Sequence, residues 1–335
     1  MKTKTLKKIG CVCALVAAQE MAAQDFHLSQ YDAAPQYLNP ALTGIYFKAK
    51  SDYRFYANYR SQWKSLAAKP YSTSALAYDM EYKKFGIGGL LLNNRSGIGK
   101  FNTLSFLASG AYRIADDEAG PHNLSAGLQI GLFYKSFSPD KFSYDSQYSE
   151  SAPSGFDPSI SSGESFAKTS LLKFDANMGV FYKYIEENKK VSPFAGLSIY
   201  HITKPNESFT DKKVRLPMRF VGHGGADIRV NDKLKLIPTV LYMNQAKAYD
   251  LNIGLMAWYT LASTEFDVML GADYRYKDAV VIQAGLKQGE HVFRISYDVN
   301  VSYLNAYSGG KGGIEFSLLL NGVKGQKIFQ PAARY

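Results

Sequence analysis

Residues 53–60 read Tyr-Arg-Phe-Tyr-Ala-Asn-Tyr-Arg, and their alternation decides the fold class of the chain. Successive side chains of a β-strand point to opposite faces of its sheet. One face carries Tyr53, Phe55, Ala57 and Tyr59, and the other carries Arg54, Tyr56, Asn58 and Arg60. The stretch therefore predicts a strand with one face suited to lipid or a protein core and the other suited to water.

The same alternation recurs toward the C-terminus, for example over residues 124–135 and 293–301. We predict fourteen strands in all, an even number as in single-chain bacterial outer-membrane barrels. They lie near residues 51–60, 72–82, 85–93, 101–113, 123–136, 171–185, 191–202, 214–230, 233–243, 248–260, 264–275, 279–287, 291–301 and 313–321.

The connections between these strands alternate in length, as expected for a barrel with periplasmic turns and longer external loops. The short set is Lys83-Lys84, 114–122, 186–190, 231–232, 261–263 and 288–290. The long set is 61–71, 94–100, 137–170, 203–213 and 302–312, with 244–247 and 276–278 as exceptions. We therefore predict an all-β, transmembrane up-and-down antiparallel β-barrel with both chain ends in the periplasm and residues 137–170 outside.

The composition agrees with a strand-rich chain, because 25 Tyr, 20 Phe and 28 Gly accompany only two Trp. A soluble β-sandwich shares this bias, so composition leaves the compartment open. After residue 23, no apolar stretch approaches the roughly 20 residues that a membrane-spanning helix requires. The Lys and Arg residues are spread singly rather than massed on one stripe, which argues against nucleic-acid binding.

The first residues have the features of a secretory signal, with a basic start, an apolar run and a small-residue exit. We place cleavage between Ala23 and Gln24, with cleavage after Ala18 as the second choice. Cleavage after Ala23 removes four lysines and Glu20 and lowers the formal charge from +10 to +7. Cys11 and Cys13 lie inside the removed run, so the mature chain has neither disulfide nor thiolate metal site.

Residues that could support catalysis or bind a metal form no recognisable constellation. The five histidines are dispersed without metal-ligand spacing, and the glycine runs at 222–225 and 309–313 lack a phosphate-loop pattern. Ser198 and His201 are separated by an odd number of residues, which places them on opposite faces of a strand. We therefore expect no catalytic, cofactor-binding or metal site, and a protein that is not an enzyme.

The segment before the first strand carries a distinctive signature, Gln-Asp-Phe-His-Leu-Ser-Gln-Tyr at 24–31 and Tyr-Leu-Asn-Pro-Ala-Leu-Thr-Gly at 37–44. It resembles the opening of the PorP/SprF family of type IX secretion proteins. Further similar stretches lie at 59–63, 223–226, 271–275 and 296–298. Ser61 and the C-terminal Ala-Ala-Arg-Tyr depart from the family pattern.

The resemblance implies a component of type IX secretion in the outer membrane of a Gram-negative bacterium. Such proteins export secreted proteins or hold adhesins at the surface, as in gliding motility. The implied partners are other type IX components in the periplasm and outer membrane, a large secreted adhesin and outer-membrane lipid. A passive porin or small-solute channel is the alternative, and a soluble secreted β-protein is a third interpretation.

The chain then divides into a signal peptide (1–23), a periplasmic or plug segment (24–50), the barrel (51–321) and a periplasmic tail (322–335). The second segment holds the strongest signature but lacks strand alternation. It can fold into the lumen or dock against periplasmic partners. Its candidate docking residues are Tyr37, Leu38, Asn39 and Pro40, where the Asn-Pro step favours a fixed turn.

Overall fold

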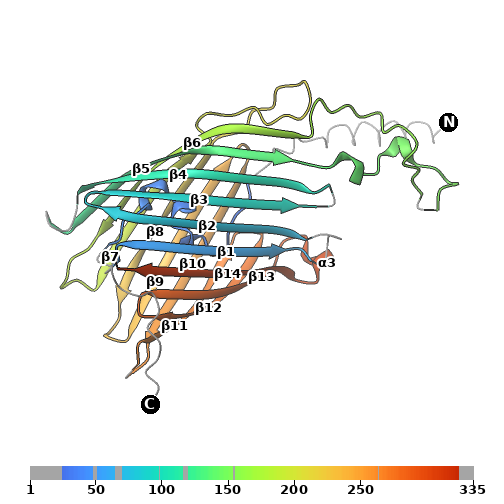
Figure 1. Cartoon of the computed structure of the whole chain (residues 1–335). Helices are drawn as coiled ribbons and strands as arrows, with labels where there is room; N and C mark the ends of the chain where they lie inside the picture. The colour runs from blue at the N-terminus through green and yellow to red at the C-terminus, as the bar shows by residue number, and fades with distance from the viewer. Residues whose placement is uncertain are drawn as a thin grey trace, which may run out of the picture.

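The wall of the molecule is a single closed sheet in which every strand pairs with its neighbours in the sequence (Figure 1). The computed structural model describes residues 25–47, 51–64, 70–97, 99–115, 120–153, 155–262 and 264–323. Its strands are β1 (Tyr53–Gln62), β2 (Tyr71–Tyr82), β3 (Phe85–Ser96), β4 (Phe101–Ala115), β5 (His122–Ser136), β6 (Ser170–Tyr184), β7 (Val191–Tyr200), β8 (Arg219–Arg229), β9 (Leu234–Gln245), β10 (Ala248–Thr260), β11 (Phe266–Arg275), β12 (Ala279–Gln288), β13 (His291–Asn300) and β14 (Lys311–Gly322).

All of these pairs are antiparallel, and β1 closes the barrel on β14 with Tyr53 opposite Gly322 and Tyr59 opposite Phe316. The predicted fourteen-stranded up-and-down barrel is therefore confirmed. The described helical turns are η1 (Tyr31–Ala33), α2 (Pro35–Leu38), η2 (Pro40–Leu42), η3 (Pro139–Lys141), η4 (Asp145–Gln147) and α3 (Asn305–Ser308). Among the described residues, no helix is long and apolar enough to cross a membrane.

The apolar face of the wall points outward and its polar face points into the lumen, which is the reverse of a soluble β-protein. Outward positions of the central strands are apolar, as at Leu128, which is 63 % exposed. The neighbouring Gln129 points inward and is 1 % exposed. A soluble sandwich would bury the apolar face and wet the polar one. The observed arrangement is the one that lipid requires around a barrel.

Most strand bounds agree with the predicted ones within three residues, but β8 does not. We predicted that strand from residue 214, whereas it begins at Arg219. Leu216, which we placed in the strand, lies before it and packs with Phe133 of β5 and Leu171 of β6. The connection between β7 and β8 therefore spans residues 201–218.

Long connections gather at one end of the barrel and short turns at the other (Figure 1). The longest, between β5 and β6, extends well beyond the wall at the long-loop end. By the usual asymmetry of outer-membrane barrels, this end faces outward and the short-turn end faces the periplasm.

Candidate functional site

Residues 25–47, here called the plug, lie inside the barrel rather than along its rim. The predicted alternative of folding into the lumen is the one the structure shows. The plug consists of three short helical turns, and two of them begin at Pro35 and Pro40. Proline suits the first position of a helix because its missing N–H would lack a partner there. Asn39 is extended, as a residue before proline prefers, and its side chain caps the second turn by accepting from the Ala41 N–H.

The plug traverses the lumen from end to end. Asp25 contacts Gln245 and His201, which lie at or just beyond strand ends on the long-loop side. Tyr46 donates to the Asp79 carboxylate on β2, near the short Lys83-Lys84 turn. Asp25, the first described residue, therefore lies at the outward end of the barrel. Our expectation that both chain ends lie at the periplasmic end is wrong for this part of the chain, because the plug runs back through the lumen before β1 begins.

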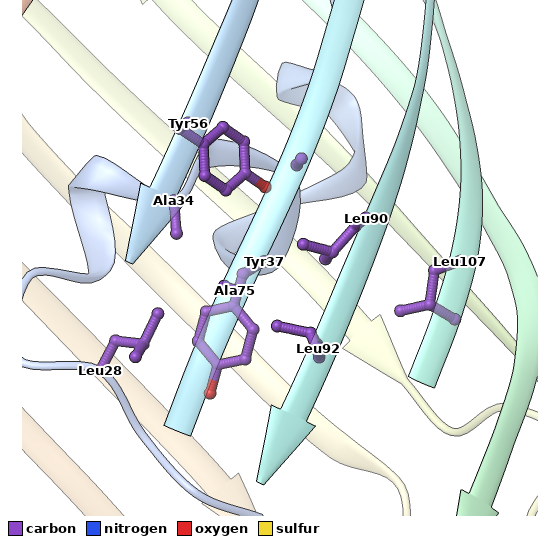
Figure 2. Close-up of a cluster of buried hydrophobic side chains, with 9 residues drawn as sticks. Leu28, Ala34, Tyr37, Tyr56, Ala75, Leu90, Leu92 and Leu107 are labelled. Atoms are coloured by element: carbon purple, nitrogen blue, oxygen red, sulfur yellow. The ribbon is translucent and has the colours of Figure 1, made fainter. Parts of the chain in front are cut away.

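One side of the plug is apolar and packs against β1–β4. Figure 2 shows Leu28, Ala34 and Tyr37 facing side chains of these strands. The wall residues of this cluster are Tyr56, Ala75, Ala77, Leu90, Leu92 and Leu107. Burial of such apolar area contributes roughly 25 cal/mol per Å². The cluster therefore holds the plug against one half of the barrel.

Buried charges hold the plug to β1 and to the neighbouring strands β13 and β14. Arg60 on β1 lies 2.7 Å from the Asp298 carboxylate and 3.1 Å from Glu315. The Ser29 N–H donates to Glu315 at 2.8 Å, and the Ser29 hydroxyl donates to Asp298. Arg275 donates to Asp298 as well. Because each carboxylate has several donors, the desolvation cost of the buried charges is offset within the cluster.

Two further arginines of the wall bind the plug. Arg294 forms a two-pronged pair with the Asp32 carboxylate, with both distances 2.8 Å. Arg54 pairs with Asp79 at 2.6 Å and donates to the Leu42 carbonyl at 2.9 Å. Bidentate arginine–carboxylate pairs are strong and geometrically specific. The plug is therefore fixed at several points along its length.

The four predicted docking residues are all buried where the plug contacts the wall. The Asn39 amide donates to the carbonyls of Val180 and Leu197 on two neighbouring strands. The backbone carbonyls of Tyr37 and Leu38 accept from Tyr200 and Ser198. A partner could contact these residues only if the plug left the lumen. Their docking role stays a prediction.

Glycines in the wall make room for the Asn-Pro turn. A Cβ added to Gly127 would lie 2.4 Å from the backbone of Pro40, and one added to Gly179 would lie 2.0 Å from Asn39. Both distances are far inside van der Waals contact. The sequence therefore fits the wall to the plug at this turn.

At the outward end, Asp25 belongs to a cluster of buried charges. His201 lies between Asp25 and Asp175, at 2.6 and 2.7 Å, and Arg219 lies 3.3 Å from Asp25. Burial opposes charge on His201, but Asp25 and Asp175 outweigh it and raise the pKa of the ring to about 9. Burial alone would raise the pKa of Asp25, yet His201 and Arg219 hold it well below its usual value.

The position of His201 corrects one prediction. We placed Ser198 and His201 on opposite faces of one strand, but β7 ends at Tyr200 and His201 has a φ of +59°. This turn brings the ring into the lumen, where Ser198 also points. The Ser198 hydroxyl donates to the Leu38 carbonyl, so it is committed to holding the plug.

Two sets of predicted features remain to be located. The cleavage residues Ala23 and Gln24 lie outside the described residues, as do most of the predicted signal and tail. Within the described residues, no three His, Cys, Asp or Glu side chains group as metal ligands.

Sequence reasoning missed the lumenal charge cluster. The alternation of the strands does place the charged residues Arg60, Asp298 and Glu315 at inward-facing positions. What sequence reasoning lacked was the register of the closing strands, which places Arg60 opposite Glu315 and beside Asp298.

A family model described as "Type IX secretion system membrane protein PorP/SprF" matches residues 20–317. The chain belongs to the PorP/SprF family. The match covers the plug and nearly the whole barrel, so it confirms the resemblance that begins in the plug signature. A search of curated protein sequences finds no match.

Solved structures that resemble this member of the PorP/SprF family are distant in sequence. The Ralstonia pickettii toluene transporter TbuX is 9 % identical with a TM-score of 0.48, covering 84 % of this chain and 91 % of that one. The Pseudomonas putida toluene transporter TodX is 8 % identical with a TM-score of 0.46, covering 84 % and 90 %. A Pseudomonas aeruginosa FadL homologue is 12 % identical with a TM-score of 0.43, covering 84 % and 91 %.

Proposed function

We propose that this protein is a plugged outer-membrane scaffold of the type IX secretion system, which supports the export of proteins or anchors secreted proteins or gliding adhesins at the surface. It works without catalysis, cofactor or metal. Its partners are other type IX components in the periplasm and outer membrane, a large secreted adhesin, and the lipid around the barrel. The family assignment supports the pathway. Export and anchoring remain two forms of the proposal.

The observation that carries this proposal is the fixation of the plug. An open channel needs a continuous aqueous path, whereas here Ser29, Gln30 and Asp32 are bound to the wall by buried hydrogen bonds and ion pairs. Opening the lumen would leave the buried Arg294 without Asp32 and would take the Ser29 and Gln30 donors from Glu315, which keeps Arg60. Leaving a buried charge unpaired typically costs about 3–5 kcal/mol. A passive porin is therefore the weaker alternative.

Planar-bilayer conductance tests the closed state. The intact protein should be nearly silent, because the plug occupies the lumen. A variant with Asp32→Leu and Arg294→Met, which removes one anchor as a pair, should conduct more. Large steady conductance of the intact protein would favour the porin.

Export is tested in cells that lack the gene. We expect loss of type IX substrates from the surface or medium, restored by the intact gene. A variant with Arg229→Met, at the exposed end of β8, serves as the control and should also restore export. Unchanged export in the deletion strain would contradict the secretion role.

A further inference from the structure

A cavity of about 280 Å³ lies at the outward end of the lumen, between the plug and the strands β8–β11. Its lining includes Phe26 and His27 of the plug, Trp63 just after β1, and Asp250 at the start of β10. The size is close to the lower limit of ordinary ligand pockets, which begin near 300 Å³. It suits one amino-acid side chain rather than a large ligand.

The charge around this cavity is unbalanced. Asp250 has one ion-pair contact among the described residues, His27 Nδ1 at 3.9 Å. Burial, together with Arg275 and Arg60, lowers the pKa of His27 well below its ordinary value, so its ring is neutral at pH 7. His27 therefore contributes no positive charge to offset the Asp250 carboxylate.

The neighbouring arginines are already committed to other carboxylates. Arg275 pairs with Asp278 and Asp298, and Arg60 pairs with Asp298 and Glu315. Two guanidinium groups thus face three carboxylates before Asp250 is counted. On the other side of the cavity, Arg219 pairs with Asp25. The exposed Lys277 stacks over Tyr276 at the rim and does not line the cavity.

Aromatic side chains line the cavity beside the Asp250 carboxylate. The backbone N–H of Trp63 donates to the Gly312 carbonyl, and its ring makes an edge contact with Tyr71 at 4.9 Å. Phe26 stacks on Tyr37 at 5.6 Å, so its ring is also fixed. The His27 Nε2 atom is buried without a partner among the described residues. Fixed aromatic rings beside a carboxylate that lacks a cationic partner are the elements that bind an alkyl chain with a cationic tip.

We propose that this cavity binds a lysine or arginine side chain of an exported polypeptide at the outer surface, with Asp250 as its ion-pair partner. The identity of the polypeptide rests on the proposed function. The site itself rests on the cavity, its unbalanced carboxylate and its aromatic lining. The plug thereby serves a second purpose, because Phe26 and His27 form one side of the site.

The chain offers a direct reporter for this binding. Trp63 and Trp258 are its two tryptophans, and Trp258 lies on β10 near the other end, against Lys235 at 4.2 Å. In a Trp258→Phe background, Trp63 alone reports on the cavity. The purified barrel is titrated with acetyl-Gly-Arg-Gly-amide, acetyl-Gly-Lys-Gly-amide and the neutral acetyl-Gly-Gln-Gly-amide. Both basic peptides should change Trp63 fluorescence in a saturable way and bind at least tenfold more tightly than the neutral one.

Asp250→Asn should weaken the basic peptides about tenfold, while Asp267→Asn on β11 near the other end should not. Gel mobility before and after boiling shows whether each variant is folded. If Asp250→Asn does not fold, the difference in affinity of the parent protein for the basic and the neutral peptides tests the site by itself. Equal binding of the neutral peptide, or unchanged binding in a folded Asp250→Asn variant, would overturn the site. Tighter binding of free spermidine than of either peptide would overturn the polypeptide assignment.

This test is separate from that of the proposed function. A barrel that conducts ions steadily but binds the basic peptides would overturn the closed scaffold and leave the site standing. A silent barrel that binds the neutral and basic peptides equally would overturn the site alone.

Discussion

The Arg60 guanidinium lies 2.7 Å from the Asp298 carboxylate, with both side chains no more than 2 % exposed. Arg60 also donates to Glu315, which is fully buried and whose carboxylate accepts from the backbone N–H groups of Ser29 and Gln30 in the plug. Arg60 on β1 therefore joins β13, β14 and the plug. Because Arg275 is a second partner of Asp298 but not of Glu315, loss of Arg60 falls most heavily on Glu315.

We predict that Arg60→Met lowers the stability of the barrel by about 3–5 kcal/mol, the usual cost of removing one partner from a buried ion pair. The measurement is the temperature at which the fast, folded band in unheated detergent converts to the slow, unfolded one. Arg229→Met removes an exposed arginine from the end of β8 and should change stability by less than about 0.5 kcal/mol. Equal shifts in the two variants would contradict the role of the buried cluster.

A second prediction tests which face of the wall meets lipid. Leu128 lies mid-strand on β5 and points outward, so Leu128→Arg should cost about 2–4 kcal/mol. Thr103→Arg on the neighbouring strand β4 places the same charge beside a lumenal cavity and should cost much less. Stability is measured by denaturant titration in detergent or lipid.

The lumenal control cannot be Gln129, although it is next in sequence. Gln129 is hydrogen-bonded to Ser109, to the Gln36 carbonyl and to Asn177, so an arginine there would displace the plug. A cost at Thr103 as large as that at Leu128 would refute the assignment of the two faces.

The wall could be predicted from the sequence because its signal is local. Strand alternation depends on residues that are two apart in the chain. The alternation of short and long connections indicates an up-and-down order of the strands. The path of the plug could not be predicted, since its anchors are far apart in the chain. Ser29 and Glu315, for example, are separated by 286 positions and meet only because β1 closes on β14.

The candidate site was found only in part. The Asn-Pro signature pointed to a fixed turn, and the structure contains that turn at Asn39. Nothing local revealed that Gly127 and Gly179 make room for it, because both lie more than eighty residues away. Leu216 shows the converse error, because a buried residue of the connection before β8 was assigned to the strand.

The charge cluster at the outward end predicts a dependence on pH. The pKa of His201 is raised to about 9 in the folded protein. The stability that protonated His201 gives to the cluster is therefore complete below the ordinary pKa of 6.5 and is lost as pH rises through 9. The pKa of Asp25 is lowered, so its effect has the opposite sign. The stability that ionised Asp25 gives is present above pH 3.8 and is lost as pH falls through the pKa of the folded protein. Attachment of Asp25 should therefore weaken as pH rises from about 6.5 to about 9.

Protease cleavage within residues 25–30 of the purified barrel measures this attachment. Cleavage should be slow at pH 7 and faster at pH 10, with rates corrected for the activity of the protease on an unfolded substrate. His201→Gln removes the titrating group and should abolish the difference between the two pH values. A pH dependence that survives in His201→Gln would assign the effect to another group.

The last prediction concerns Asn39 and Pro40 together. Replacing both with Ala removes the amide that donates to Val180 at 2.9 Å and to Leu197 at 3.3 Å, and frees the turn that proline restricts. Two carbonyls of the wall then lose a donor, at a cost of about 0.5–1.5 kcal/mol each. The closed wall retains its own hydrogen bonds, so we expect normal gel mobility of the unheated protein together with impaired export or surface display. Lys233→Ala, in an exposed turn between β8 and β9, is the control and should leave both unchanged. Folding, conductance and export are measured on the same preparations and strains. Normal export with normal folding would remove the functional role of this turn, whereas loss of folding would show that the turn is a structural strap on the barrel.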